Sequence, residues 1–335
     1  MEPVTSTSYI VLGVALFMLL NSAALAVYFE RRIAAAIQNR VGPNRVGPLG
    51  LFQPLADVLK LLVKEDVTPT QGYRFIHTIA PIIPVFTALM TAAVIPFGEG
   101  LFITDINSGV LYLLAITSLG VYGVTLAGWA SNSKYSLLGG LRAAAQMVSY
   151  ELPLGMAIAS CILFSQSLSV VDVAESQAYW WNIFRNPIAA VIFIVATFAE
   201  ANRTPFDLVE AEQELVGGFH TEYSSMKFGM FFLAEYMHVV IGSMLITTFF
   251  FGSYHLPFAG YWLPEIGGMW KAVLDVTVFS VKSIFFGFVF IWVRWTIPRF
   301  KYNQVMKLGW KKMLPISIVN FMVLAILVYA YHNFL

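Results

Sequence analysis

Eight apolar segments of this 335-residue chain are long enough to cross a lipid bilayer, and they constrain its fold more than any other feature. About 20 helical residues, at 1.5 Å each, cross a hydrocarbon layer of roughly 30 Å. Hydrophobic residues make up 58% of the chain and charged residues only 12%, against about 25% charged residues in soluble domains. Backbone polar groups in a bilayer must be hydrogen-bonded within the segment, so such segments form helices. The sequence therefore predicts an all-α polytopic integral membrane protein with one transmembrane domain, 1–335, and eight transmembrane helices near 8–29, 76–97, 108–130, 141–164, 187–203, 227–252, 272–296 and 313–334.

The basic residues are distributed unequally between the two sides that these spans define. Seventeen of the 20 Lys and Arg residues fall on one side, most of them in the loops 30–75 and 294–312. A third loop on that side, 200–227, is acidic. Because loops rich in Lys and Arg stay in the cytoplasm, we expect all three loops to be cytoplasmic and both termini to lie outside. The first apolar run has no basic flank before it, so we interpret it as a span rather than a cleaved signal peptide.

The first of these loops predicts an amphipathic helix. Residues 40–48, RVGPNRVGP, contain two Gly-Pro pairs, which favour turns. The segment from Leu51 then predicts a helix with Pro54 in its first turn and one polar face made of Gln53, Asp57, Lys60 and Lys64. About 15 helical residues cannot cross the bilayer, so we expect this helix to lie in the membrane interface. It is either an ordinary surface helix with a solvated face or a wall beside a site.

The acidic residues are concentrated in one part of the chain. Seven of the 19 Asp and Glu residues lie between 200 and 235, next to membrane spans. Ionisable groups at membrane depth are costly, so they usually line a water-filled path or a cavity. If the chain is helical beyond Pro205, one face carries Asp207, Glu210 and Glu214. Neighbouring carboxylates repel one another, which predicts a coupled group that exchanges protons near neutral pH.

Further ionisable residues fall inside the predicted spans. Glu151 lies about ten residues into the fourth span, and Lys282 is similarly deep in the seventh, on the same helical face as Asp275. Glu235 and His238 lie one turn apart in the sixth. Paired charges of this kind can simply hold helices together. Since acids outnumber buried bases, a proton or cation path is the favoured interpretation.

Motifs for redox cofactors and nucleotides are not found. The sequence contains no G-x-G-x-x-G, P-loop or H-E-x-x-H motif and one cysteine, Cys161, so neither a disulfide framework nor a cysteine-ligated cluster is predicted. The five histidines show no facing pair that suggests haem ligation. We therefore expect this chain to bind no redox cofactor, and any electron transfer would depend on a partner.

Three long runs resemble one family closely. They are ERR…IQNRVGPNRVGPLGLFQPLADVLKLLVKE from Glu30, AEANRTPFDLVEAEQELVGGFHTEYSSMKF…FFLAEY up to Glu235, and WVRWTIPRFKYNQVMKLGWK from Trp292. With SYELP around Glu151, they resemble the quinone-chamber membrane subunit of respiratory complex I, the proton-pumping NADH:quinone oxidoreductase, over nearly the whole chain. Three residues depart from the pattern expected for that family: Ala201, Lys301 and Asn303.

The resemblance implies a fold and a function. It implies eight transmembrane helices plus the interfacial helix after the first, and a cytoplasmic face that docks the peripheral arm. Quinone is the implied substrate, with its chamber and tunnel at Arg31, Asp57, Arg203, Phe219, Arg294 and Arg299. Coupling of quinone reduction to proton translocation is implied at Glu151, Glu200, Glu210, Glu212, Glu222 and Glu235, and the residue patterns above add Asp207, Glu214 and Lys282.

The same resemblance implies partners and a location. FMN and iron–sulfur clusters would be carried by partner subunits rather than by this chain. The implied partners are the peripheral-arm subunits of the quinone site, small membrane subunits and antiporter-like subunits, in addition to quinone and membrane lipids. No nucleic acid partner is expected. A bacterial cytoplasmic (inner) membrane is the expected location.

Three other functions are compatible with parts of this pattern. The homologous subunit of a membrane-bound hydrogenase, or of a ferredoxin-driven relative, would keep the charge path without quinone. A stand-alone cation/proton antiporter could use the same carboxylates, although the sequence has no internal repeat and its basic loops favour a docking surface. A passive membrane anchor would leave Glu151 and Lys282 without a use.

Overall fold

The computed structural model describes residues 6–209, 212–257 and 269–334, and within these ranges the chain is helical without a β-sheet. The long helices are α1 (Ser6–Ile37), α5 (Gly109–Ala130), α6 (Lys134–Ser165), α11 (Ser225–Phe250), α13 (Met269–Thr296) and α15 (Leu314–Phe334). The shorter ones are α2 (Gln53–Val63), α3 (Arg74–Ile79), α4 (Ile82–Ala92), α7 (Val170–Glu175), α8 (Asn182–Arg185), α9 (Pro187–Glu200), α10 (Glu212–Leu215) and α14 (Tyr302–Leu308). The all-α prediction is confirmed for these residues.

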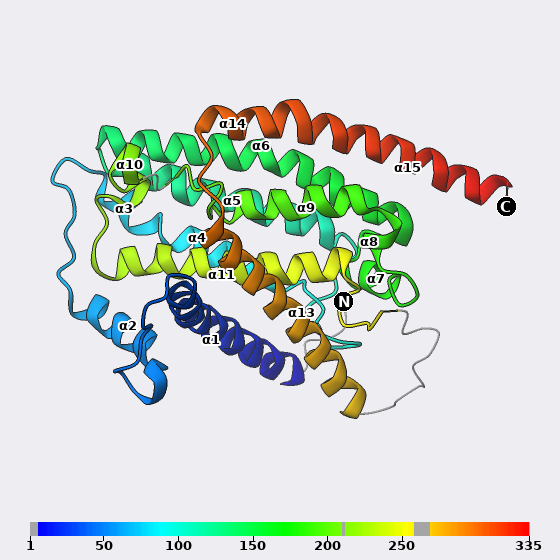
Figure 1. Cartoon of the computed structure of the whole chain (residues 1–335), viewed down its shortest axis with the longest axis horizontal. Coiled ribbons are helices and arrows are strands. Elements are labelled where there is room, and N and C mark those ends of the chain that lie inside the picture. Colours follow the sequence, from blue (N-terminus) through cyan, green and yellow to red (C-terminus); the bar gives the residue numbers. More distant parts are fainter. Residues whose placement is uncertain (1–5, 210–211, 258–268, 335) are drawn as a thin grey trace.

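The helices form a bundle around α6 and α11. Helix α6 packs against α5, α9 and α15, whereas α11 packs against α1, α4 and α13. Figure 1 shows α15 along one edge of the bundle, with α1 and α13 on the opposite side. Small residues let α5 approach its neighbours closely: a Cβ at Gly128 would lie 2.5 Å from the backbone oxygen of Ser136, and one at Gly123 2.5 Å from Pro84 Cδ. Close approach through glycine is common in membrane helix packing.

Seven helices or helix pairs of the described residues are long and apolar enough to cross a membrane. Six of these seven spans contain one long helix each: α1, α5, α6, α11, α13 or α15. The seventh combines α3 and α4 over Arg74–Ala92. The predicted span near 187–203 is α9, an apolar helix of 14 residues that is only about 21 Å long. It ends early because the chain turns directly after Glu200. The polytopic membrane class is therefore confirmed, while helix length alone supports seven spans.

Helix α2 matches the amphipathic helix predicted after the first span. It begins at Gln53 with Pro54 in its first turn, and it lies at the edge of the bundle, where it contacts α1 and α11 (Figure 1). None of its residues is buried. Several of its apolar side chains are exposed, with 63% exposure at Leu55 and 57% at Leu62. A helix with an uncovered apolar face of this kind is stable where lipid covers that face.

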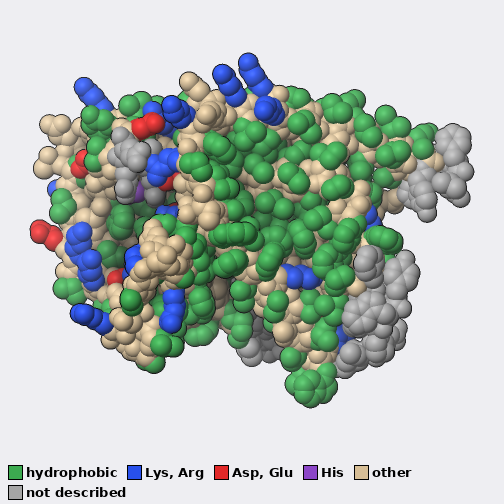
Figure 2. All heavy atoms as spheres, viewed as in Figure 1, with side chains coloured by type: hydrophobic (Ala, Val, Ile, Leu, Met, Phe, Trp, Pro, Cys, Tyr) green, Lys and Arg blue, Asp and Glu red, His purple; other side chains and the backbone are tan. Residues whose placement is uncertain are grey.

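The surface divides into an apolar region and a charged end. Figure 2 shows hydrophobic side chains over the middle of one face, while most of its charged side chains gather toward the end where α2, α3 and α10 lie. Exposed apolar side chains are numerous on α15, α13 and α1, for example Leu327 (61%), Ile284 (70%) and Phe17 (69%). A lipid environment accounts for this exposure because lipid tails are as apolar as these side chains.

Candidate functional site

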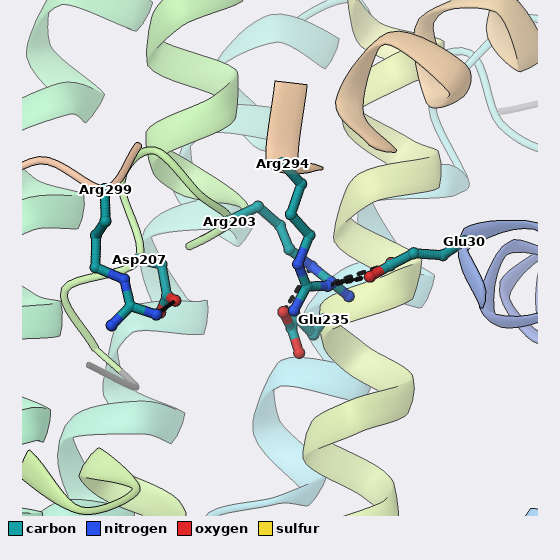
Figure 3. Close-up of polar contacts among 6 residues, drawn as sticks. All are labelled: Glu30, Arg203, Asp207, Glu235, Arg294 and Arg299. Carbon is teal, nitrogen blue, oxygen red and sulfur yellow. Dashed lines mark hydrogen bonds and ion pairs between the residues drawn. The ribbon is translucent and has the colours of Figure 1, made fainter. Parts of the chain in front are cut away.

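A buried network of four charged side chains joins α1, α11 and α13 to the loop after α9 (Figure 3). Arg203, in that loop, has its Nη1 3.2 Å from Glu30 Oε2 of α1 and its Nε 2.6 Å from Glu235 Oε1 of α11. Arg294, in the last turn of α13, places its Nη1 2.5 Å from Glu30 Oε1. The guanidinium carbon of Arg203 also lies over the Tyr236 ring, 4.3 Å from its centroid. We call these four charged residues the Arg203 network; its two arginines and two glutamates balance in charge.

Burial makes the charges of this network interdependent. The side chain of Arg203 is 3% exposed and that of Glu30 9%. Burial alone disfavours the cationic form of Arg203, but the carboxylates of Glu235 and Glu30 outweigh it and raise the pKa of Arg203 above its ordinary value. Arg203 therefore remains positively charged. Removing either carboxylate would leave a buried cation with an incomplete set of partners.

A second ion pair lies beside the network. Arg299 Nη2 donates to Asp207 Oδ2 at 2.5 Å, and the Asp207 side chain is 9% exposed (Figure 3). The backbone N–H of Phe300 donates to the carbonyl of Pro205 at 3.0 Å. These contacts bind the loop after α13 to the loop after α9. The loop after α13 is therefore fixed against the loop that carries Arg203.

The condition that the chain is helical directly after Pro205 is not met. Residues 203–209 form turns, with Phe206 N–H bonded to the Arg203 carbonyl and Leu208 N–H to the Phe206 carbonyl, and α10 has only four residues. Asp207 is drawn to Arg299, whereas Glu214 pairs with Arg142 of α6 at 2.6 Å and remains 55% exposed. The tertiary ion pairs therefore separate two carboxylates that were expected on one helical face. Glu210 lies outside the described residues, and only the backbone of Glu212 is described.

One cavity extends from Glu235 of the Arg203 network into the bundle, and a second, smaller one lies beyond it. The larger is lined by aromatic side chains, including Phe219 and Phe231, and by Glu200, Glu235 and His238. The smaller is lined by residues of α5 and α6 and again by Glu200. Both cavities also share Met147 in their walls. Glu200 therefore stands between them.

The smaller cavity ends at Glu151. Its Oε1 accepts a hydrogen bond from the hydroxyl of Ser118 on α5, and Thr117 and Val121 complete the wall. On the network side, Glu235 belongs both to the Arg203 network and to the wall of the larger cavity. Carboxylates thus follow one another from Glu235 to Glu200 and Glu151 along the walls of the two cavities. Ionisable side chains inside membrane proteins commonly mark ion or proton paths.

The comparisons with known proteins agree on one family. Residues 10–325 match the family model described as NADH dehydrogenase. The chain belongs to this family. It is 57% identical to an NADH-quinone oxidoreductase subunit of Salinibacter ruber, over 92% of each chain. It is 55% identical to "NADH-quinone oxidoreductase subunit 8" of Rhodothermus marinus, over 92% of this chain and 95% of that one. It is 48% identical to an NADH-quinone oxidoreductase subunit of Leptospira biflexa, over 89% of this chain and 88% of that one.

The predicted resemblance to the complex I membrane subunit is therefore confirmed, and the chain is a homologue of an oxidoreductase subunit. The structure brings together several of the residues predicted for this family member. Arg203 and Arg294 share one network, and Phe219 lines the larger cavity. Arg31 and Asp57, expected at similar depth, form an ion pair of 2.6 Å between α1 and α2. Their roles remain predictions.

Other predicted residues lie apart from this site. Glu222 is exposed, and Glu214 is at the surface beside Arg142. Lys282 donates to the backbone carbonyls of Phe251, Ser253 and His255, at 2.5–2.9 Å, and lies over the Trp181 ring. These carbonyls follow the C-terminal end of α11, whereas Glu235 lies in its first half. Lys282 therefore stabilises the opposite end of the helix and is not part of either cavity wall.

Sequence reasoning missed two members of the site. Glu30 was not expected to act, yet it bridges Arg203 and Arg294. Its signal in the sequence is a carboxylate immediately before Arg31 and Arg32 near the end of a span. Tyr236 was also missed, and it lies against Arg203 as the neighbour of Glu235. No group of three or more His, Cys, Asp or Glu residues in the described part of the chain could hold a metal ion.

Proposed function

We propose that this chain is the membrane subunit of a proton-translocating NADH:quinone oxidoreductase that forms part of the quinone chamber and couples quinone reduction to proton translocation. The names of its relatives supply the reaction class. One observation carries the coupling role: Glu235 joins the Arg203 network to a cavity, and Glu200 joins that cavity to a second one ending at Glu151. An ion network at one end and a carboxylate path leading inward are what such coupling requires.

The quinone would bind at the charged end of the bundle. Arg31, Asp57, Arg299 and Phe219 are the chamber residues that accompany the Arg203 network in this proposal. The Arg31–Asp57 pair is partly exposed, at 41% and 32%, and the Arg299 side chain is 34% exposed. Guanidinium groups accessible in this way can stabilise the negative charge that a quinone head gains on reduction. Aromatic walls such as Phe219 suit the flat apolar part of the ring.

Charge at the quinone would act on the path through Arg203. A negative charge near this end competes with Glu235 for the arginine, which favours proton uptake by Glu235. The proton can then pass through water in the larger cavity to Glu200, and through the smaller one to Glu151. Moving one charge against 100 mV costs about 2.3 kcal/mol. Two unit charges 6 Å apart interact by about 2.8 kcal/mol at an effective dielectric constant near 20, which is of similar size.

The topology in this proposal has eight spans, with α9 as a short one, and both termini outside. The basic loops 30–75 and 294–312 and the loop 200–227 then face the cytoplasm, as the positive-inside rule requires. They would dock the peripheral-arm subunits that carry FMN and iron–sulfur clusters, while small membrane subunits and antiporter-like subunits would lie beside the bundle. The location is the bacterial cytoplasmic membrane.

A mild-detergent pull-down of the tagged chain tests the proposal. Flavin and iron–sulfur subunits in the eluate, with inhibitor-sensitive NADH:quinone activity, are the expected result. A nickel–iron hydrogenase arm would replace the quinone proposal with the related hydrogenase. A chain that elutes alone and moves cations in liposomes would refute membership of an electron-transfer complex.

A further inference from the structure

The last part of the chain has a strong charge imbalance. After Asp275 the sequence contains seven Lys and Arg residues and no Asp or Glu. Four of these basic residues are exposed and form no ion pair with any residue that the structure describes, namely Lys301, Lys307, Lys311 and Lys312. Figure 2 shows basic side chains projecting from the edge of the bundle where Figure 1 places α14. A cluster of this kind attracts an anion.

Two of these lysines are held outward by a π-helical turn. Gly309–Met313 form this turn between α14 and α15. Its inner side is bound to α6: a Cβ on Gly309 would lie 3.4 Å from the Tyr150 ring, and Trp310 Nε1 donates to Ser149 Oγ at 2.9 Å. Gly309 and Met313 are buried, so the turn presents Lys311 and Lys312 away from the bundle. The position of these two cations is therefore set by packing rather than left to a mobile loop.

An apolar stripe begins below these lysines and runs along α15. Counting from Lys312, the residues at spacings of 4, 3, 4 and 3 lie on one helical face, and they are Ile316, Val319, Val323 and Ile326. Their exposed fractions are 50%, 60%, 52% and 67%. From Ile316 to Ile326 the stripe is about 15 Å long, comparable to the hydrocarbon depth of one lipid leaflet. The opposite face of α15 packs on α6 and α9, so the stripe is the side that the chain leaves uncovered.

We propose that Lys311, Lys312 and this stripe form a binding site for an anionic phospholipid. The lipid phosphate accepts hydrogen bonds from the two ammonium groups, and an acyl chain lies along the stripe. Trp310, 46% exposed, sits at the same level, where aromatic side chains are enriched at membrane interfaces. Charge decides the choice of occupant, since a zwitterionic lipid covers the stripe but carries a cation that opposes the lysines. Lys311 and Lys312 are the last residues of the loop 294–312, so a lipid bound here leaves the earlier part of that loop for the docking proposed above.

Quenching of Trp310 by brominated lipids tests this site in the full chain. The chain is reconstituted in phosphatidylcholine containing either brominated phosphatidylglycerol or brominated phosphatidylcholine, and the Trp310 signal is obtained by subtracting Trp310→Phe. We expect stronger quenching by the anionic lipid. Each lysine near the surface contributes about a fivefold preference, so Lys311→Gln with Lys312→Gln should lower the preference about 25-fold.

Two further variants separate the site from general charge or folding effects. Lys134 is exposed at the start of α6, away from the stripe, and Lys134→Gln should leave the preference unchanged. The double variant Lys311→Arg with Lys312→Arg keeps both positive charges and should retain the preference for the anionic lipid. Three results would overturn the proposal. The first is equal quenching of Trp310 by both lipids, and the second is a loss of preference in Lys134→Gln as large as that in the Lys311 and Lys312 variant. The third is an absence of Trp310 quenching in native membranes because another polypeptide covers the stripe.

Discussion

The Arg203 network predicts a large effect for a substitution that changes neither shape nor size, Glu30→Gln. Glu30 contacts Arg203 at 3.2 Å and Arg294 at 2.5 Å. The substitution leaves two arginines with one carboxylate, Glu235, which is bound to Arg203. Arg294 loses the carboxylate that it contacts in the described chain, and a network that was neutral gains a net positive charge.

The cost follows from the burial of the network. Two unit charges 4 Å apart interact by about 4 kcal/mol at an effective dielectric constant of 20. Arg294 is 26% exposed, so hydration replaces part of the lost interaction energy there. Arg203 is only 3% exposed, so water cannot replace the lost interaction at its guanidinium group. Removing one member of a buried ion pair typically costs about 3–5 kcal/mol. We expect the free energy of unfolding to fall by about 3 kcal/mol, at the lower end of that range.

Thermal or denaturant unfolding of the purified chain in detergent measures this loss. Asp57→Asn is the matched control, because it removes the same charge from the Arg31–Asp57 pair, which is 41% and 32% exposed. Such an exposed pair contributes below about 1 kcal/mol. The double variant Glu30→Gln with Arg294→Gln restores neutrality, so it should be more stable than the sum of the two single losses predicts.

The outcomes distinguish the interpretations. A loss for Glu30→Gln no larger than that for Asp57→Asn would show that the network is hydrated and that its charges are not coupled by burial. Additive losses in the double variant would contradict the proposed balance of charge. Either result would refute the reasoning, since both burial and neutrality are needed for the predicted magnitude.

Three further predictions concern other parts of the molecule. Glu200→Gln or Glu151→Gln should lower quinone-dependent NADH oxidation and proton pumping in assembled membranes. Glu222→Gln, at an exposed position, is the control and should retain both activities. Wild-type activity in Glu200→Gln and Glu151→Gln would contradict the proposed proton path. Lys282→Met removes the donor to three backbone carbonyls and should lower the unfolding temperature, since each buried acceptor left unpaired costs about 1–3 kcal/mol; an unchanged unfolding temperature would contradict this role. Burial, together with the positive charge of Lys282, lowers the pKa of His255 to about 4 from 6.5. The unfolded chain then binds more protons between these pH values, so stability should fall as the pH drops from 6.5 toward 4, and His255→Gln should flatten that part of the stability profile.

Most of the spans and the amphipathic helix α2 could be predicted because they depend on local sequence. Apolar length identified most spans, and Pro54 with the polar stripe around Asp57 identified α2. The polar residues Asn202 and Arg203 mark the end of α9 at Glu200, but the predicted span was extended to 203.

The acidic residues after Pro205 show what their spacing along the sequence could not reveal. The spacing of the acidic residues was compatible with one helical face, but the chain gains more from separate ion pairs with Arg299 and Arg142. Both arginines come from distant parts of the sequence. A spacing pattern carries no information about such partners.

The sequence by itself determined that the chain is a helical membrane protein of this family, and it predicts that the basic loops lie on one side and that carboxylates enter the bilayer. These properties follow from composition, periodicity and long runs of characteristic residues. Only the tertiary structure decided which charges meet. Glu30 and Arg203 are 173 residues apart in sequence, and Glu200 stands between two cavities because α5, α6 and α11 pack around it. The energy of a buried charge depends on its neighbours in space, which helix packing brings together and sequence spacing does not encode.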